Sequence, residues 1–348
     1  MPLNILDLPS ELLDRIVGLV LTHRDSPPST SDRLHTFGDR ILVLRPLPTG
    51  RNDYDKSYGY GNVKYYANQE PLYHNWTSAS ASLLLVNRQL AEVTRWRLGQ
   101  LSKSSHYALD VMLVNEMELW PTWTFLTPPC EQVDTLTATF RITGTSPTLD
   151  GRKFRFTSGQ DEPPRIIWCF FHLLETFVEC GPLAEHRQSE PQAESRDRFT
   201  IKNLTLDFKT PTGLMAPSSL EYDNWLEGHG NKDPRTSYTW PYNTVETLMM
   251  RPEWLVSLIS DYIGYSLDMN MFSHNFGKFL MEHVGNIRIC LDGSLVKMHS
   301  VEHRIKEHYD RMIARYTKFP LKMACYRFHL MIEKRKKGGL SVTEQYRV

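Results

Sequence analysis

The sequence predicts an α+β or α/β protein, with a helical module over residues 1–100 followed by an α/β body over residues 101–348. Two observations support this prediction. Apolar residues recur at helical spacing in two segments of the first hundred residues, and from residue 107 onward segments of alternating apolar residues are interspersed with helical ones. Such interspersed strands and helices are typical of a mixed or partly parallel sheet with helices packed on it.

The first predicted helix begins at Pro9, whose fixed φ suits the first turn of a helix. Glu11 and Asp14 place negative charge near the positive end of the helix dipole. The apolar residues form two adjacent rows, with Leu8, Leu12, Ile16 and Leu19 in the first and Leu13, Val17 and Val20 in the second. Together the rows are wider than one helix contact needs, which indicates that part of this face serves a partner.

The second predicted helix follows a run of hydroxyl side chains at residues 77–82, which can cap it. Its apolar residues Leu83, Val86, Leu90 and Val93 follow helical spacing. Between the two helices, residues 22–76 form a long insert, in which a short strand is expected over 40–44. Residues 50–66 are rich in Gly and Tyr and form either an adaptable binding surface or, as the preferred interpretation, a loop folded over the core.

Within the body, alternating apolar residues predict four strands, over 107–114, 133–142, 201–208 and 287–291. Helices are expected over 166–178, 252–262, 272–283, 301–316 and 321–332. Pro121 and Pro128 are expected in a loop after the first strand, and residues 211–242 in a long surface loop.

Three apolar triplets in the body look like recurring strand elements. They are Leu136-Thr137-Ala138, Leu204-Thr205-Leu206 and Ile287-Arg288-Ile289, and their starts are 68 and 83 residues apart. A leucine-rich-repeat horseshoe needs a period of about 20–29 residues. Regular repeats are therefore excluded, whereas a degenerate repeat-like α/β array is left open.

The two N-terminal helices resemble a known family. The pattern L-P-x-E-L-L-x-x-I from Leu8 to Ile16, followed by L-x-x-V-N-R-x-L from Leu83 to Leu90, resembles the F-box found in many fungal F-box-like proteins. The chain departs from that pattern in the long insert between Val20 and Leu83, because an ordinary F-box joins its helices through a few residues.

The resemblance implies a small helical module that docks on a Skp-type adaptor and, through it, on a cullin–RING ubiquitin ligase. Carried onto this sequence, the adaptor-binding residues would be Leu8, Pro9, Leu12, Leu13, Ile16, Val17, Val86, Arg88 and Leu90. The body would then present a protein target, whose identity the sequence does not reveal. The alternative is a self-contained interaction or scaffold protein, in which the helices are intramolecular core and bind no adaptor.

Composition excludes several other functions. Forty basic and forty acidic residues give a net charge of zero, so neither a nucleic acid nor a membrane is expected as a partner. Asp7 and Glu11 interrupt the apolar residues of the N-terminus, so no export signal is expected and the protein is placed in the cytoplasm or the nucleus. No catalytic motif is present, so the chain is not expected to be an enzyme and no cofactor is predicted.

Three further clusters have two interpretations each. His299 and His303 could share a metal ion on a helix, but a solvated polar face is preferred, so no metal site is predicted. Trp120 and Trp123 flank a proline and could line a ligand groove, but packing is preferred. The basic run at residues 334–337 could be a nuclear import signal or a phosphate contact, but a solvated C-terminal tail is preferred.

Overall fold

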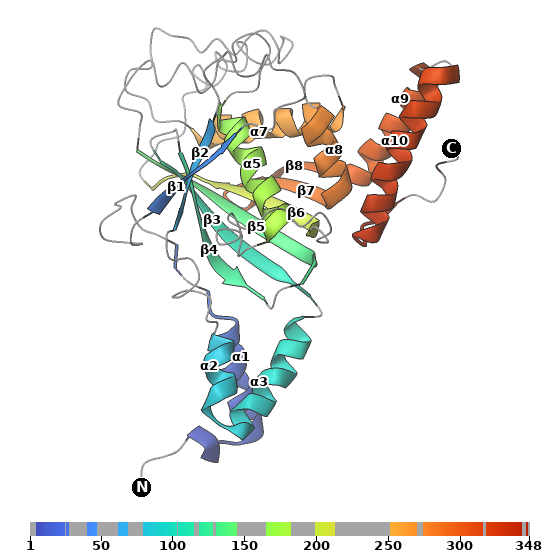
Figure 1. The fold of residues 1–348 in the computed structure, drawn as a ribbon. Coiled ribbons are helices and arrows are strands. Elements are labelled where there is room, and N and C mark those ends of the chain that lie inside the picture. Colours follow the sequence, from blue (N-terminus) through green and yellow to red (C-terminus); the bar gives the residue numbers. More distant parts are fainter. Residues whose placement is uncertain are drawn as a thin grey trace.

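The computed structural model describes residues 5–24, 26–27, 40–46, 62–68, 79–102, 104–114, 118–127, 130–144, 165–181, 199–212, 251–269, 274–315, 318–342 and 346. A three-helix unit precedes a body made of a sheet and helices, which confirms the predicted α+β or α/β fold (Figure 1). Arg24, just after the first helix, lies over the ring of Phe125 in the body at 5.5 Å from its centroid.

The three-helix unit consists of α1 (Ser10–Leu21), preceded by the short 3₁₀ helix η1 (Ile5–Asp7), α2 (Ala79–Val86) and α3 (Arg88–Leu101). Pro9 lies just before α1, at the N-cap, and not within its first turn. The single helix predicted around Leu83–Val93 is wrong, because the chain breaks at Asn87. The Asn87 side chain accepts a hydrogen bond from the backbone N–H of Leu90 at 2.9 Å and so starts a new helix.

The sheet has the strand order β1-β2-β4-β3-β5-β6-β7-β8. Its centre is four parallel strands, β3 (His106–Val114), β5 (Gln132–Thr143), β6 (Thr200–Lys209) and β7 (Val284–Leu291). The strands β4 (Glu118–Leu126) and β8 (Ser294–Ser300) pair antiparallel at either side, and β1 (Arg40–Pro46) and β2 (Asn62–Asn68) extend the sheet beyond β4. The predicted mixed, partly parallel sheet is thereby confirmed.

The three recurring triplets lie side by side in this sheet. Leu136 is directly opposite Leu204, and Leu204 is opposite Ile287. The unequal spacing along the sequence is taken up by the connections between the strands. Among the described residues, the connection from β5 to β6 contains a helix over 165–180, and that from β6 to β7 contains helices over 252–267 and 274–283.

Two expectations about loops are wrong. Pro121 lies inside β4, where it is opposite Val111 of β3. On its other edge, β4 pairs with β2 at Leu119. Pro121 lies past this pairing, where the N–H group that proline lacks is not needed for a hydrogen bond to β2. Residues 62–66, the end of the segment 50–66 expected in a loop or binding surface, belong to β2, while residues 50–61 lie outside the described residues.

In the part of the chain that the structure describes, four helices pack against strands of the sheet and a fifth packs on two of those helices. The four are α5 (Arg165–Cys180), α7 (Pro252–Leu267), α8 (His274–His283) and α9 (Val301–Arg315), and the fifth is α10 (Lys318–Lys337), which packs on α8 and α9. The helices and the strands share one apolar core, to which β5 contributes Leu136, Ala138, Phe140 and Ile142. The predicted surface loop over 211–242 lies outside the described residues from position 213 onward.

The basic run at residues 334–337 is not a tail, because it forms the last turn of α10. Arg335 in this run is fully buried, and its guanidinium donates hydrogen bonds to the carbonyl oxygens of Met281, Val284 and Ser341 at 2.7–2.8 Å. After the helix the chain turns back onto the body, where Leu340 is buried. The expected solvated tail is therefore wrong for residues 334–342.

Candidate docking surface

The three-helix unit has a small apolar core of its own. Leu13 and Val17 of α1 are each 1% exposed and pack with Leu90 of α3. The half-buried residues around them are Leu6, Leu21, Leu83 and Val93. Two residues of the second predicted row are thus intramolecular core, although the third, Val20, is exposed.

An ion pair holds α1 against α3. The Arg97 guanidinium donates two hydrogen bonds to the carboxylate of Asp14, one of them 2.5 Å long from Nε to Oδ1. Both side chains are about one-quarter to one-third exposed, 26% for Asp14 and 32% for Arg97. Because the guanidinium and the carboxylate are joined by two parallel hydrogen bonds, the pair fixes the orientation of α1 relative to α3 as well as the distance between them. A Cβ at Gly18 would lie 3.5 Å from the Arg97 side chain, an ordinary van der Waals contact, so the pair does not require glycine at this position.

Apolar side chains remain exposed on all three helices of the unit. Leu19 is 65% exposed, Leu85 85% and Trp96 55%. The full set of exposed large apolar residues on η1 and the three helices is Ile5, Leu12, Leu19, Val20, Leu85, Val86 and Trp96. A set this dense on a unit this small is typical of a surface that a partner covers.

The nine adaptor-binding residues carried over from the F-box resemblance fall into three groups. Leu13, Val17 and Leu90 are buried in the unit's own core, so a partner could not contact them without opening the unit. Leu8 and Ile16 are half-buried. The remaining four, Pro9, Leu12, Val86 and Arg88, are exposed.

Five exposed apolar residues lie outside that set, namely Ile5, Leu19, Val20, Leu85 and Trp96. Leu19 belongs to the first predicted row, because Leu12, Ile16 and Leu19 follow i, i+4, i+7 spacing. The feature of the sequence that could have indicated the exposure of Leu85 is Asn87. This residue ends α2 at Val86, the residue after Leu85. No pattern in the sequence distinguishes Trp96 from a residue that packs inward.

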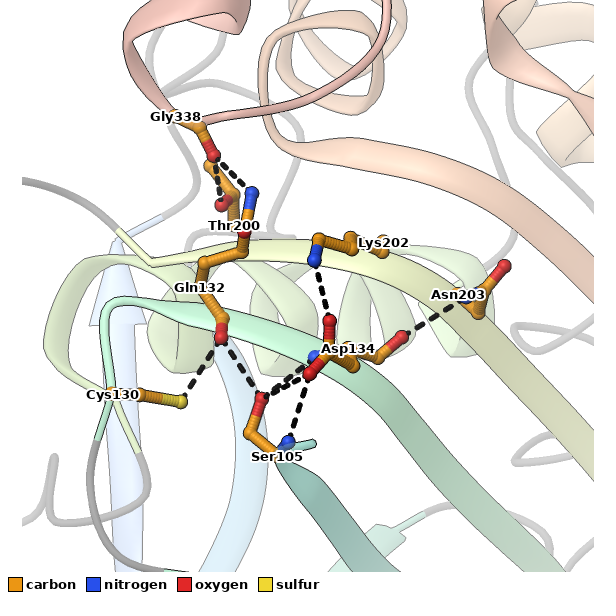
Figure 2. Close-up of polar contacts among 8 residues, drawn as sticks. All are labelled: Ser105, Cys130, Gln132, Asp134, Thr200, Lys202, Asn203 and Gly338. Atoms are coloured by element: carbon orange, nitrogen blue, oxygen red, sulfur yellow. Dashed lines mark hydrogen bonds and ion pairs between the residues drawn. The ribbon is translucent and has the colours of Figure 1, made fainter. Parts of the chain in front are cut away.

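A second group of polar side chains lies at the start of the parallel strands (Figure 2). The carboxylate of Asp134 accepts a hydrogen bond from the backbone N–H of Ser105 at 2.9 Å and from Lys202 Nζ at 2.6 Å. Burial alone would raise the pKa of the Asp134 carboxyl, but these donors outweigh it and hold the pKa below its usual range. Gln132 and Thr200 both donate to the carbonyl of Gly338, at 2.8 and 2.7 Å.

This polar group is structural. Ligands of open α/β sheets bind outside the carboxyl ends of the strands, whereas Asp134, Gln132 and Thr200 lie at the amino ends of β5 and β6. Its donors and acceptors are bonded to one another, and the bonds to Gly338 tie the end of α10 to the sheet.

The other clusters singled out in the sequence do not form a site. His299 lies in β8 and His303 in α9, so the two are not on one helix, and within the described residues no group of three potential metal ligands occurs. Trp120 is buried, and Trp123 packs between Tyr107 and Phe177, with ring centroids 6.1 and 5.4 Å away. Among the helices of the described ranges, none is long and apolar enough to cross a membrane.

Comparisons of this sequence with protein-family models, with curated proteins and with solved structures found no match. The candidate surface is therefore described from the structure alone. It is a three-helix unit with seven exposed large apolar side chains, held together by a small core and by the Asp14–Arg97 ion pair between α1 and α3.

Proposed function

We propose that this chain is a non-catalytic interaction protein, in the cytoplasm or the nucleus, whose three-helix unit docks on a Skp-type adaptor of a cullin–RING ubiquitin ligase. One observation supports the proposal above the others. The helices that resemble an F-box carry apolar side chains that the fold leaves exposed, with Leu12 and Leu19 on α1 and Leu85 and Val86 on α2.

The docking contacts proposed here differ from those carried over from the resemblance. Leu13, Val17 and Leu90 keep the helices together, while Leu12, Leu19 and Trp96 supply contact area. Burying one such side chain contributes about 1.5–3 kcal/mol, and a stable interface of usual size covers about 1,600 Å² in total. A few of these side chains at the centre of an interface are enough for a micromolar or tighter complex.

The mechanism is proximity. A target protein bound to the body is held near the ubiquitin-conjugating enzyme that the ligase recruits, which raises the effective concentration of the target's lysines there. In this proposal the chain itself forms and breaks no bond.

The alternative, a self-contained scaffold protein, is favoured by the burial of Leu13, Val17 and Leu90 in the unit's own core. The scaffold function differs from the ligase function in one testable respect. It does not require an adaptor that binds the exposed residues Leu12 and Leu19 of α1.

The two functions are separated by co-purification with a Skp-type adaptor. We expect the wild-type chain to form a complex at micromolar concentration, and the double variant Leu12→Asp, Leu19→Asp to lose it. The matched control is Leu295→Asp, Met298→Asp, which changes two equally exposed apolar side chains of β8 and should leave binding intact. Both variants must keep the wild-type circular dichroism. No complex with the folded wild type, or equal loss in both variants, would contradict the adaptor role.

A further inference from the structure

The exposed large apolar side chains of the described residues occur in two groups, with none between residues 97 and 294. The first group is the docking surface on the three-helix unit. The second lies at the C-terminal end of the fold, on β8, α9 and α10, and comprises Leu295, Val296, Met298, Ile313, Met323, Tyr326 and Leu330. Figure 1 shows α9 and α10 on a different side of the sheet from the three-helix unit.

The helix α10 has apolar residues on two opposite sides. One side packs into the body through Cys325, Phe328, Met331 and Ile332, all of which are buried. The other side carries Met323, Tyr326 and Leu330, which are 50%, 58% and 45% exposed. A helix that is apolar on both sides is covered on both sides in most folds.

The exposed side follows the spacing of a coiled-coil seam. Met323, Tyr326 and Leu330 are three and four residues apart, which is the a–d–a spacing of a heptad. The buried residues Phe328 and Arg335 then fall at f, the position opposite the seam. The apolar seam is therefore set apart from the side of α10 that the body uses.

The positions that flank such a seam, e and g, are basic on α10. They are occupied by Arg327 and Lys334 at e and by Lys322, His329 and Lys336 at g. Lys334 is also paired with Glu282 and Lys336 with Glu333, so Lys322 and Arg327 carry most of the positive charge offered to a partner. Between residues 318 and 337 the chain has seven Lys or Arg and one Glu, although its overall net charge is zero. Charges at e and g decide which helix pairs with which. A second copy of α10 would place like charges across the seam, whereas an acidic helix would place opposite charges there.

We propose that the Met323–Tyr326–Leu330 seam of α10 binds an amphipathic helix of a protein partner that has acidic residues on both sides of its apolar stripe. Arg335 keeps the seam in place, since its three hydrogen bonds to backbone carbonyls fasten the last turn of α10 to the body. A surface that is already fixed loses little conformational freedom on binding. The seam is about two turns long, so the interface is smaller than a standard one and the complex is weak and salt-dependent.

The test uses two synthetic three-heptad peptides with Leu at every a and d position. One peptide has Glu at e and g, the other has Lys there, and both are titrated into the full-length chain by fluorescence anisotropy at low and at high salt. We expect the Glu peptide to bind at least about tenfold more tightly than the Lys peptide, with most of the difference lost at high salt. The titration needs no adaptor, so its outcome is independent of the ligase proposal.

Two variants and one control assign the binding to the seam. Tyr326→Glu with Leu330→Glu should abolish binding of the Glu peptide, and Lys322→Glu with Arg327→Glu, at two exposed flanking positions, should reverse the preference between the peptides. Lys306→Glu on α9 alters an exposed basic residue away from the seam and should change nothing. Equal binding of both peptides, no binding of either, or recruitment by anionic vesicles in place of the Glu peptide would overturn the proposal.

Discussion

The three-helix unit and the sheet body use their apolar residues in opposite ways. The unit buries four apolar side chains, those of Leu13, Val17, Leu90 and Ala91, and leaves seven large apolar side chains exposed. The body buries the apolar face of every central strand in one large core shared with its helices and, within the described residues, exposes large apolar side chains only at its C-terminal end. A unit of this size has too little interior for all its apolar residues, and the docking proposal rests on those that stay exposed.

The largest expected effect, and one confined to the body, comes from replacing Arg335. Changing Arg335→Ala leaves the carbonyls of Met281, Val284 and Ser341 without their donor and opens space at the end of α10. We expect the body to lose about 3–5 kcal/mol of unfolding free energy, while hydrogen exchange in α1 and α3 stays unchanged. Urea unfolding followed by tryptophan fluorescence measures the loss. Lys336→Ala, one residue along and exposed, is the control, and equal midpoints for the two variants would show that the buried bonds contribute nothing.

Acid should also weaken the body more than the unit. Burial, followed by the nearby charges of Lys297 and Arg304, lowers the pKa of His299 from 6.5 to about 4. The folded state therefore binds fewer protons than the unfolded state between these values, so stability is complete above pH 6.5 and falls as the pH drops toward 4. The loss is on the order of 3 kcal/mol.

Urea midpoints between pH 7 and pH 4.5 test this prediction by comparing the wild type with His299→Gln. The stability of the variant should depend less on pH than that of the wild type, by the amount that His299 contributes. If the two plots of urea midpoint against pH are parallel, folding does not change the pKa of His299. The histidine of the three-helix unit in the described residues, His23, is exposed. The protection factors of the α1 amides, which are corrected for the intrinsic pH dependence of exchange, should change little over the same range of pH.

The core of the unit is tested by Leu13→Ala. We expect a loss of about 2–3 kcal/mol, at the low end for a buried leucine because the surrounding cluster is small and close to solvent. Hydrogen exchange in α1 and α3 should speed up accordingly, with the melting of the body unchanged. Leu12→Ala, the neighbouring exposed residue, should alter stability by less than about 0.5 kcal/mol and yet weaken adaptor binding. If both variants destabilise α1 equally, the division between core and docking residues is wrong.

The sequence predicts those parts of the fold that depend on neighbouring residues. The alternation Leu136, Ala138, Phe140 predicts β5 and its buried face, and Pro252 predicts the start of α7. It does not predict that Arg335 is buried, since its acceptors at Met281 and Val284 lie more than fifty residues away. A basic run looks solvated until those carbonyls are known.

The same limit applies to the docking surface. Leu12 and Leu13 are equally apolar neighbours on one helix, and only the position of Leu90 on α3 decides that Leu13 is core and Leu12 is exposed. The pattern from Leu8 to Ile16 indicates a helix with a wide apolar face. It does not indicate how that face is divided between the chain and its partner.

The smallest expected effect concerns the joint between α2 and α3, which determines where the exposed residues of α2 lie. The Asn87 side chain satisfies the N–H of Leu90, and Asn87→Ala removes that cap at a cost of about 1 kcal/mol. Asn87→Asp keeps the acceptor and is the matched control. Because Leu85 and Val86 end α2 directly before this joint, loss of the cap should also weaken adaptor binding, although neither exposed side chain is altered. Faster exchange at the start of α3 with unchanged adaptor binding would show that docking depends on α1 alone.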